Sequence, residues 1–139
     1  MPKICYAAVV INSLTLADCR KLDIVVNKFC RFVRWKIAQF RNLSTVQVRS
    51  ELGLSPIRTV FSTADAKLFF DILHNNIDSD FLLGKIAFRV PSRRTRHTDL
   101  FVEDGQSMNP LLRGAYLWNR FELDILKCRR AEIKAAVQH

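Results

Sequence analysis

The chain has 139 residues, 49% of them hydrophobic, which is enough for one small domain whose apolar core needs neither disulfides nor a metal. Its 22 Lys and Arg residues against 13 Asp and Glu give a formal net charge of +9, which favours an anionic partner. No apolar run approaches the roughly 20 residues of a membrane-spanning helix. We therefore expect a soluble intracellular protein, nuclear or cytoplasmic, with no membrane partner.

A short apolar run and a long helix open the chain. Residues 4–11 match a signal-peptide apolar region in length, but only one charged side chain precedes them and no convincing cleavage site follows, so we expect a core element. From Ala17 to Phe40, apolar residues at three- and four-residue spacing predict a helix capped by Thr15 or Asp18. Its apolar positions are Leu22, Val25, Val26, Phe29, Phe32, Val33 and Phe40, and its basic positions are Arg20, Lys21, Lys28, Arg31, Arg34 and Lys36.

The basic positions of this helix allow two interpretations, a solvated face or a surface that contacts a polyanion. Trp35 lies beside Arg34 and Lys36 and close to Arg41 in the sequence. Such a ring can stack on a nucleic-acid base next to phosphate-neutralising charges, or it can pack in a core or interface. Both interpretations stay open at this point.

Two further helices are predicted in the middle of the chain. The segment from Thr45 to Leu52 follows Ser44 and is ended by Gly53, the residue typical of a helix C-terminus. A cap-and-proline pair, Ser55–Pro56, opens a core helix that His74–Asn75–Asn76 ends, and His74 is expected to interact with the helix dipole there. The apolar face of this core helix is expected to comprise Ile57, Val60, Phe61, Ala64, Leu68, Ile72 and Leu73.

Three shorter helices are predicted in the second half. Asp78 or Ser79 can cap the first of them, from Phe81 to Lys85. A further cap-and-proline pair opens the segment 111–121, and an amphipathic pattern covers 123–137. The expected fold class is therefore all-α, a single domain over residues 1–139 with five or six helices and one long basic loop.

The long basic loop runs from Phe88 to Phe101, FRVPSRRTRHTDLF, where five basic side chains lie between Asp80 and Asp99 with no acid among them. Guanidinium groups bond phosphate oxygens in a bidentate way without reading sequence. The alternatives are a solvated loop, or arginines paired with Glu103, Asp104 or the acids of 65–80. The residues predicted to bind nucleic acid are Arg93, Arg94 and Arg96, supported by Arg89 and Lys85 and by Arg31, Arg34 and Lys36 of the first long helix.

Catalysis and metal binding find no support in the sequence. The four cysteines have no C-x-x-C spacing and the three histidines are isolated, so we expect reduced thiols and neither a metal nor a cofactor. No nucleophile, phosphate-loop or dinucleotide motif occurs. The one acidic cluster is expected to serve structure, with no catalytic residue and no small-molecule substrate. It comprises Asp65, Asp71, Asp78 and Asp80.

The segment 77–101 resembles the "ID…LL..I.F.VPSR.TR…LF" stretch near the C-terminus of non-LTR retrotransposon reverse transcriptases of the jockey-like and related arthropod types. Tyr6–Val10, Leu22–Phe32, Glu51–Ser55 and Leu68–Leu73 are similar, in order, to that family's "YGSVVW", "I..VQ.RF.RF", "LGL.SL" and "LF.YK.L.G" stretches, and Asn109–Asn119 to its "NSP…R…YN". The chain departs from the family at Val10–Ile11, where a tryptophan is usual, and at Asn75–Asn76, where Asn–Gly is common.

The resemblance implies a helical region that follows the fingers, palm and thumb of an RNA-directed DNA polymerase, as a remnant or fragment of the element. The polymerase's catalytic aspartates match nothing here, so the resemblance implies no enzyme activity for this chain. Its expected partners are RNA or DNA, bound through phosphates, and the polymerase domain itself. The alternative function is a structural or protein-interaction module that docks on a polymerase body or on another acidic protein.

Overall fold

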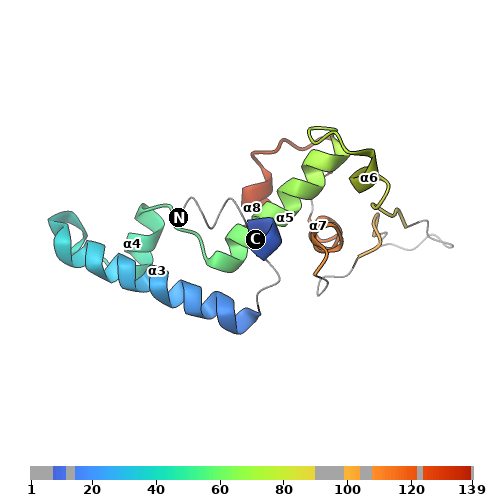
Figure 1. Ribbon diagram of the computed structural model, residues 1–139. Coiled ribbons are helices and arrows are strands. Elements are labelled where there is room, and N and C mark those ends of the chain that lie inside the picture. The colour runs from blue at the N-terminus through green and yellow to red at the C-terminus, as the bar shows by residue number, and fades with distance from the viewer. Residues whose placement is uncertain (1–7, 12–14, 90–98, 104–107, 122–123, 139) are drawn as a thin grey trace. The chain divides into compact units, whose positions relative to one another are not determined.

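The computed structural model describes residues 8–11, 15–89, 99–103, 108–121 and 124–138 (Figure 1). Within these residues the regular secondary structure is helical, which confirms the all-α class. An isolated antiparallel bridge pairs Phe88 with Phe101. No helix in the described ranges is both long and apolar enough to cross a membrane. The helices are α2 (Ala8–Ile11), α3 (Leu16–Lys36), α4 (Thr45–Glu51), α5 (Ile57–Leu73), α6 (Asp80–Leu83), α7 (Pro110–Trp118) and α8 (Ile133–Gln138), with a 3-10 turn η1 (Ala38–Phe40).

The chain divides into two compact units. The α3–α4 unit is Leu14–Val60, and the α5–α7 unit is Met1–Ser13 together with Phe61–His139. Helix α5 begins in the former and continues in the latter. Each unit is described by itself below, and the expected single domain over residues 1–139 stays a prediction.

Local capping residues fix the helices of the α3–α4 unit. The Thr15 hydroxyl oxygen accepts a hydrogen bond from the Asp18 backbone N–H at 3.3 Å, so Thr15 is the N-cap of α3. Ser44 and Gln47 form a reciprocal capping box at the start of α4, with bonds of 3.2 and 2.8 Å. Gly53, with a φ of 64°, follows the end of α4 as predicted.

One arginine joins three parts of the α3–α4 unit. Arg49 of α4 forms an ion pair with Asp23 of α3 and donates to the carbonyl oxygens of Leu54 and Ser55, each at 2.9 Å. The Asp23 carboxylate also accepts the backbone N–H of Ile57 at 3.2 Å, and so satisfies a free donor in the first turn of α5. The apolar core of the unit comprises Cys19, Val26, Cys30, Val33, Val48 and Ile57.

The apolar face predicted for α3 is partly wrong. Val26 and Val33 are buried, but Val25, Phe29 and Phe32 are each more than half exposed. The apolar residues of this 21-residue helix occupy more than one side of it, whereas α4 has only seven residues and spans about a third of its length. The helix also ends at Lys36, four residues before the predicted end at Phe40.

The core of the α5–α7 unit is aromatic. The rings of Phe69 and Phe101 meet edge to face with centroids 4.8 Å apart, and Phe70 stacks on Trp118 at 6.1 Å. The indole N–H of Trp118 donates to the Ala66 carbonyl at 3.0 Å. Buried residues of this core are Ala66, Phe69, Phe70, Phe101, Ala115, Trp118, Ile125 and Ile133.

Helices α5 and α7 approach closely at Gly114. A Cβ atom at this position would lie 2.7 Å from the Cβ of Phe69 and 3.1 Å from the backbone oxygen of Asp65. Helix α5 is the core helix, as predicted, but its buried side includes residues that the predicted apolar face left out. Phe69 and Phe70 are buried, whereas Ala64 and Leu68 are only half-buried.

The remaining helix ends follow local signals except at the C-terminus. Ser79, not Asp78, is the N-cap of α6, and Asn109 caps α7 with Pro110 at its first position. The predicted helix over 123–137 is wrong before Ile133. Its first part is a turn in which the Asp124 carboxylate accepts the Leu126 N–H at 3.0 Å, a local bond that competes with helix formation.

Candidate nucleic-acid interface

The basic residues at the C-terminal end of α3 are exposed. Arg31, Arg34 and Lys36 are all exposed, and no Asp or Glu occurs anywhere between Asp23 and Glu51. The two acids of α3 already have partners, because Asp18 pairs with Lys21 at 3.0 Å and Asp23 pairs with Arg49. Within the described residues, no ion pair neutralises Arg31, Arg34 or Lys36.

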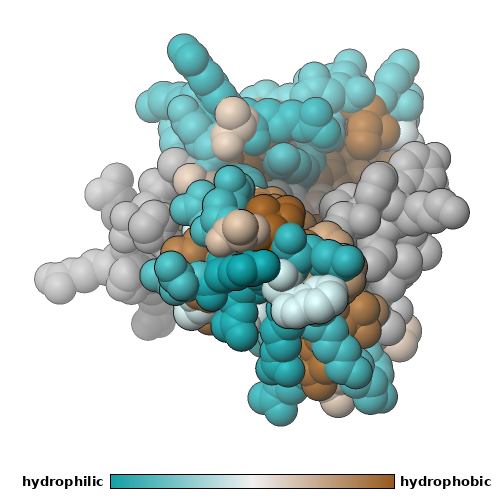
Figure 2. All heavy atoms as spheres, turned by 90° about the vertical axis from the view of Figure 1, so that its left-hand side faces the viewer, coloured by the Kyte–Doolittle hydropathy of each residue, from teal (hydrophilic) through white to brown (hydrophobic). Residues whose placement is uncertain are grey.

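Exposed aromatic rings lie among these cations. Trp35 is 68% exposed and Phe32 is 55% exposed, and their ring centroids are 6.5 Å apart with a 45° tilt. The Lys36 ammonium lies 4.9 Å from the centre of the Trp35 ring. Figure 2 views the side where α4 and the C-terminal end of α3 lie in Figure 1, and hydrophobic residues are interspersed there among hydrophilic ones.

The three arginines on which the sequence prediction rests most, Arg93, Arg94 and Arg96, lie outside the described residues. The two ends of the basic loop are described. The Arg89 N–H donates to the Leu100 carbonyl and the Val102 N–H to the Ala87 carbonyl, both at 2.9 Å. The loop therefore leaves and rejoins the fold through a short antiparallel stem, here called the loop stem (residues 87–89 and 100–102).

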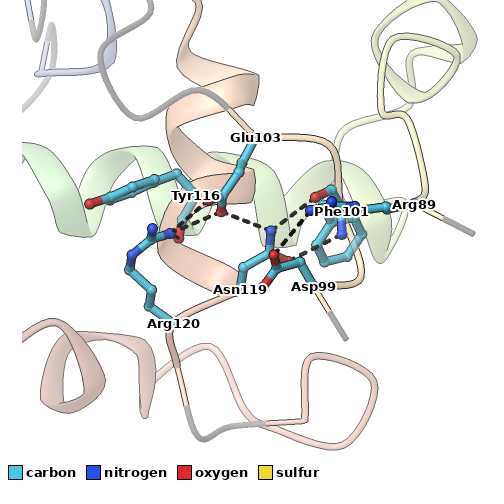
Figure 3. Close-up of polar contacts among 7 residues, drawn as sticks. All are labelled: Arg89, Asp99, Phe101, Glu103, Tyr116, Asn119 and Arg120. Carbon is cyan, nitrogen blue, oxygen red and sulfur yellow. Dashed lines mark hydrogen bonds and ion pairs between the residues drawn. The ribbon is translucent and has the colours of Figure 1, made fainter. Parts of the chain in front are cut away.

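The Asn119 side chain forms hydrogen bonds with both backbone groups of Phe101 in the loop stem (Figure 3). Its Oδ1 accepts the Phe101 N–H at 3.1 Å and its Nδ2 donates to the Phe101 carbonyl at 2.9 Å. The amide thus pairs with this backbone as a neighbouring strand does in a sheet. Nδ2 also donates to Glu103 at 2.8 Å, which ties the residues after the stem to the end of α7.

Glu103 is the ionic partner of Arg120. The Arg120 guanidinium donates to both oxygens of Glu103, at 3.1 and 2.9 Å, and lies 3.4 Å from the centre of the Tyr116 ring (Figure 3). Burial favours the neutral acid, but the hydrogen bonds from Arg120 and Asn119 outweigh it and lower the pKa of Glu103. Glu103 is therefore ionised at neutral pH. Its hydrogen bonds with Asn119 and Arg120 hold the residues after the loop stem to the end of α7.

The lowered pKa of Glu103 predicts that the free energy of unfolding depends on pH. Because the pKa of Glu103 is lower in the folded state than its ordinary 4.5, the ionised form stabilises the fold above that value and the stabilisation is lost as pH falls. In urea unfolding at a series of pH values, we expect the wild type to lose stability more steeply below about pH 5 than Glu103→Gln. The control is Glu51→Gln, which removes an exposed carboxylate of the α3–α4 unit. Parallel profiles for wild type and Glu103→Gln would contradict the assignment.

Of the two supporting cations near the loop stem, Arg89 has an acidic partner among the described residues. Arg89 pairs with Asp99 at 3.2 Å, although both side chains remain well exposed (Figure 3). Lys85 is exposed and lies 5.2 Å from the centre of the Phe81 ring. Both belong to the α5–α7 unit, whereas Arg31, Arg34 and Lys36 belong to the α3–α4 unit.

The acidic cluster serves structure where its partners are described. Asp65 is 1% exposed and accepts two bonds from the Arg113 guanidinium, at 2.7 and 3.2 Å. Asp71 accepts bonds from Arg130 at 2.7 Å and from Asn76 at 3.2 Å. Arginines of the C-terminal third thus pair with these acids, and among the described residues no three metal-ligating side chains converge.

His74 lies at the C-terminal end of α5, as predicted, and makes two side-chain contacts that the sequence did not indicate. Its ring stacks on Phe70 with centroids 4.0 Å apart and its Nε2 lies 2.8 Å from the Ile125 carbonyl oxygen. Since a carbonyl only accepts, Nε2 carries the proton and donates. The imidazole joins α5 to the turn that precedes α8.

Sequence reasoning missed Asn119 and Arg113 as organising residues. Each acts on a partner far away in the chain, Phe101 at 18 residues and Asp65 at 48 residues. The only sequence signal for either was its place inside the stretch similar to the "NSP…R…YN" motif.

No family model matches the chain, and neither a curated protein sequence nor a solved structure matches it.

Proposed function

We propose that this chain binds nucleic acid through phosphate contacts, as a non-catalytic C-terminal remnant or fragment of a non-LTR retrotransposon reverse transcriptase. The observation that carries the binding is the exposure of Arg31, Arg34 and Lys36 in the C-terminal part of α3, on a segment without acids. The order of the motifs, above all at 77–101, supports the family. The role requires no cofactor and no small-molecule substrate.

The charge distribution favours phosphate over other anionic partners. Guanidinium groups bond two phosphate oxygens at once, and each neutralised phosphate releases condensed counterions. On α3, Arg31 and Arg34 are three residues apart and therefore neighbours on the helix surface. The loop arginines Arg93, Arg94 and Arg96 supply a second basic segment in the sequence. Binding of this kind is independent of base sequence and weakens with salt.

The test is the salt dependence of binding, measured by fluorescence anisotropy with a labelled DNA duplex. For Arg31→Ala/Arg34→Ala/Lys36→Ala, we expect lower affinity for every duplex sequence and a plot of log affinity against log salt that is flatter by roughly 0.9 per lost phosphate contact. The matched control is Lys127→Ala/Arg129→Ala/Lys134→Ala, which removes three exposed charges elsewhere and should change the slope far less. Unchanged affinity and slope in the α3 variant would contradict the assignment to α3.

A second variant measures how much the basic loop contributes to nucleic-acid affinity. Arg93→Ala/Arg94→Ala/Arg96→Ala substitutes three residues within the segment 90–98. We expect it to lower affinity and slope in the same sense, because its guanidinium groups suit the same phosphate contacts. If the wild type fails to bind duplex and single strands even at low salt, nucleic-acid binding as a whole is refuted.

A specific observation favours a second candidate function, a protein-interaction module. Val25 and Phe29 expose apolar surface on α3, and contiguous exposed apolar surface marks contacts with other proteins. The partner in this case is a polymerase body or another acidic protein. Size-exclusion chromatography with a supplied polymerase domain distinguishes the two, since Phe29→Ala should abolish co-elution and leave nucleic-acid affinity unchanged.

A further inference from the structure

We propose that α3 binds single-stranded nucleic acid, with bases stacked on Trp35 and Phe32 and phosphates held by the neighbouring cations. This inference rests on the proposed function and names its substrate class. A single strand differs from a duplex in that the faces of its bases are accessible to a side-chain ring. The distinguishing residues are therefore the aromatic ones, since the cations serve either form.

The exposed rings are the first step of the argument. Trp35 and Phe32 are 68% and 55% exposed, although both belong to the residue types with most to gain from leaving water. They are three residues apart on one helix and so share a side of it. With centroids 6.5 Å apart and a 45° tilt, the rings do not stack face to face on each other. Two adjacent rings thus face solvent on a rigid element.

The cations around the rings are the second step. Arg31 is four residues before Trp35, and Lys28 is four residues before Phe32, so each ring has a cation as a helix-surface neighbour. Lys36 already lies against Trp35, at 4.9 Å from the ring centre. Rings that accept bases next to groups that neutralise phosphate are the combination by which proteins bind single strands without sequence preference.

The choice between a protein and a single strand is the third step. A purely apolar face would favour a protein, but Lys28, Arg31 and Lys36 lie beside Phe32 and Trp35 on α3, together with the exposed Phe29. No acid follows Asp23 on this helix. A protein surface that covered the two rings would also need several acidic groups to pair with the cations beside them. A nucleic-acid strand supplies a phosphate with every base and so matches both kinds of side chain.

Intrinsic fluorescence tests the inference directly, because the chain has two tryptophans in different environments. Trp118 is 4% exposed with its N–H bonded to Ala66, whereas Trp35 faces solvent. Titration with oligothymidylate is expected to quench the Trp35 emission, and titration with a DNA duplex is expected to quench it far less. In Trp35→Phe, where Trp118 is the remaining tryptophan, oligothymidylate should leave the emission unchanged.

Binding measurements on ring variants complete the test. Trp35→Ala should weaken oligothymidylate binding by roughly 5- to 150-fold, which corresponds to loss of one stacked base, and leave duplex affinity unchanged. Trp35→Phe keeps a ring and should recover part of the loss. The control is Phe81→Ala, which removes a ring that is 72% exposed beside Lys85 in the other unit. Circular dichroism confirms that each variant keeps its helix content.

The outcomes separate this inference from the proposed function. Equal losses for single strand and duplex in Trp35→Ala, or no quenching of Trp35, would overturn the stacking while phosphate binding stands. Absence of binding to both forms at low salt would refute both proposals. If light scattering shows a dimer that Trp35→Ala dissociates, a second copy covers the rings and the inference fails.

Discussion

Replacement of Asp65 with alanine is expected to lower the free energy of unfolding of the α5–α7 unit by roughly 3–5 kcal/mol. The Asp65 carboxylate is 1% exposed and receives two bonds from Arg113, whose side chain is itself only 10% exposed. Removal of the carboxylate breaks both bonds and takes away the negative charge that faces the buried guanidinium. Arg113 also donates to the uncharged carbonyl oxygens of Met108 and Val9.

The measurement is urea unfolding followed by Trp118 fluorescence, in a Trp35→Phe background that leaves Trp118 as the reporter of this unit. Lys127→Ala breaks an exposed pair with Asp124 and should cost less than about 1 kcal/mol. The double variant Asp65→Leu/Arg113→Met removes both charges and should lose less stability than Asp65→Ala. A loss below about 1 kcal/mol for Asp65→Ala would contradict the buried pair.

Truncation of Phe69 to alanine is the second large effect, an expected loss of roughly 3–5 kcal/mol. The Phe69 ring is buried at 1% exposure and packs edge to face on Phe101, while its Cβ lies at the closest approach of α5 to α7, beside Gly114. Because backbone atoms line that approach, we expect the helices to be unable to collapse into the vacated volume. A cavity therefore remains and adds its own cost to the lost burial.

The matched control for Phe69→Ala is another phenylalanine of the same unit. Phe81 is 72% exposed, so Phe81→Ala should change the free energy of unfolding by about 0.5 kcal/mol or less. Both variants are compared in the Trp35→Phe background by urea unfolding. Equal losses from Phe69→Ala and Phe81→Ala would show that the α5–α7 core is not organised around Phe69.

Local signals in the sequence predicted most helix ends correctly. Thr15, Ser44 and Ser79 cap the helices that follow them, and Gly53 and Asn75 lie just past helix ends with φ of 64° and 55°. These signals work because a cap satisfies backbone groups within a few residues of itself. The prediction for 123–137 failed because a local Asp124 bond replaces the first helical turns, although the apolar spacing fits a helix.

Which side of a helix is buried was less predictable, because it depends on partners distant in the sequence. Periodicity placed Phe29 and Phe32 in a core, but the short α4 leaves them exposed. Among the candidate site residues, Arg31, Arg34 and Lys36 are exposed as a binding role requires, and Arg89 has an acidic partner that the sequence pattern did not single out. Arg93, Arg94 and Arg96 stay predictions.

The loop stem gives the basic loop two defined ends. Its two ends are held together by the Phe88–Phe101 bridge and by the Asn119 amide, which are contacts made by residues outside 90–98. A different sequence of the same length, inserted between Arg89 and Asp99, therefore meets the same anchoring groups. The stem is in this sense a graft point, at which an uncharged or a more basic segment can be installed and its binding compared with that of the wild type.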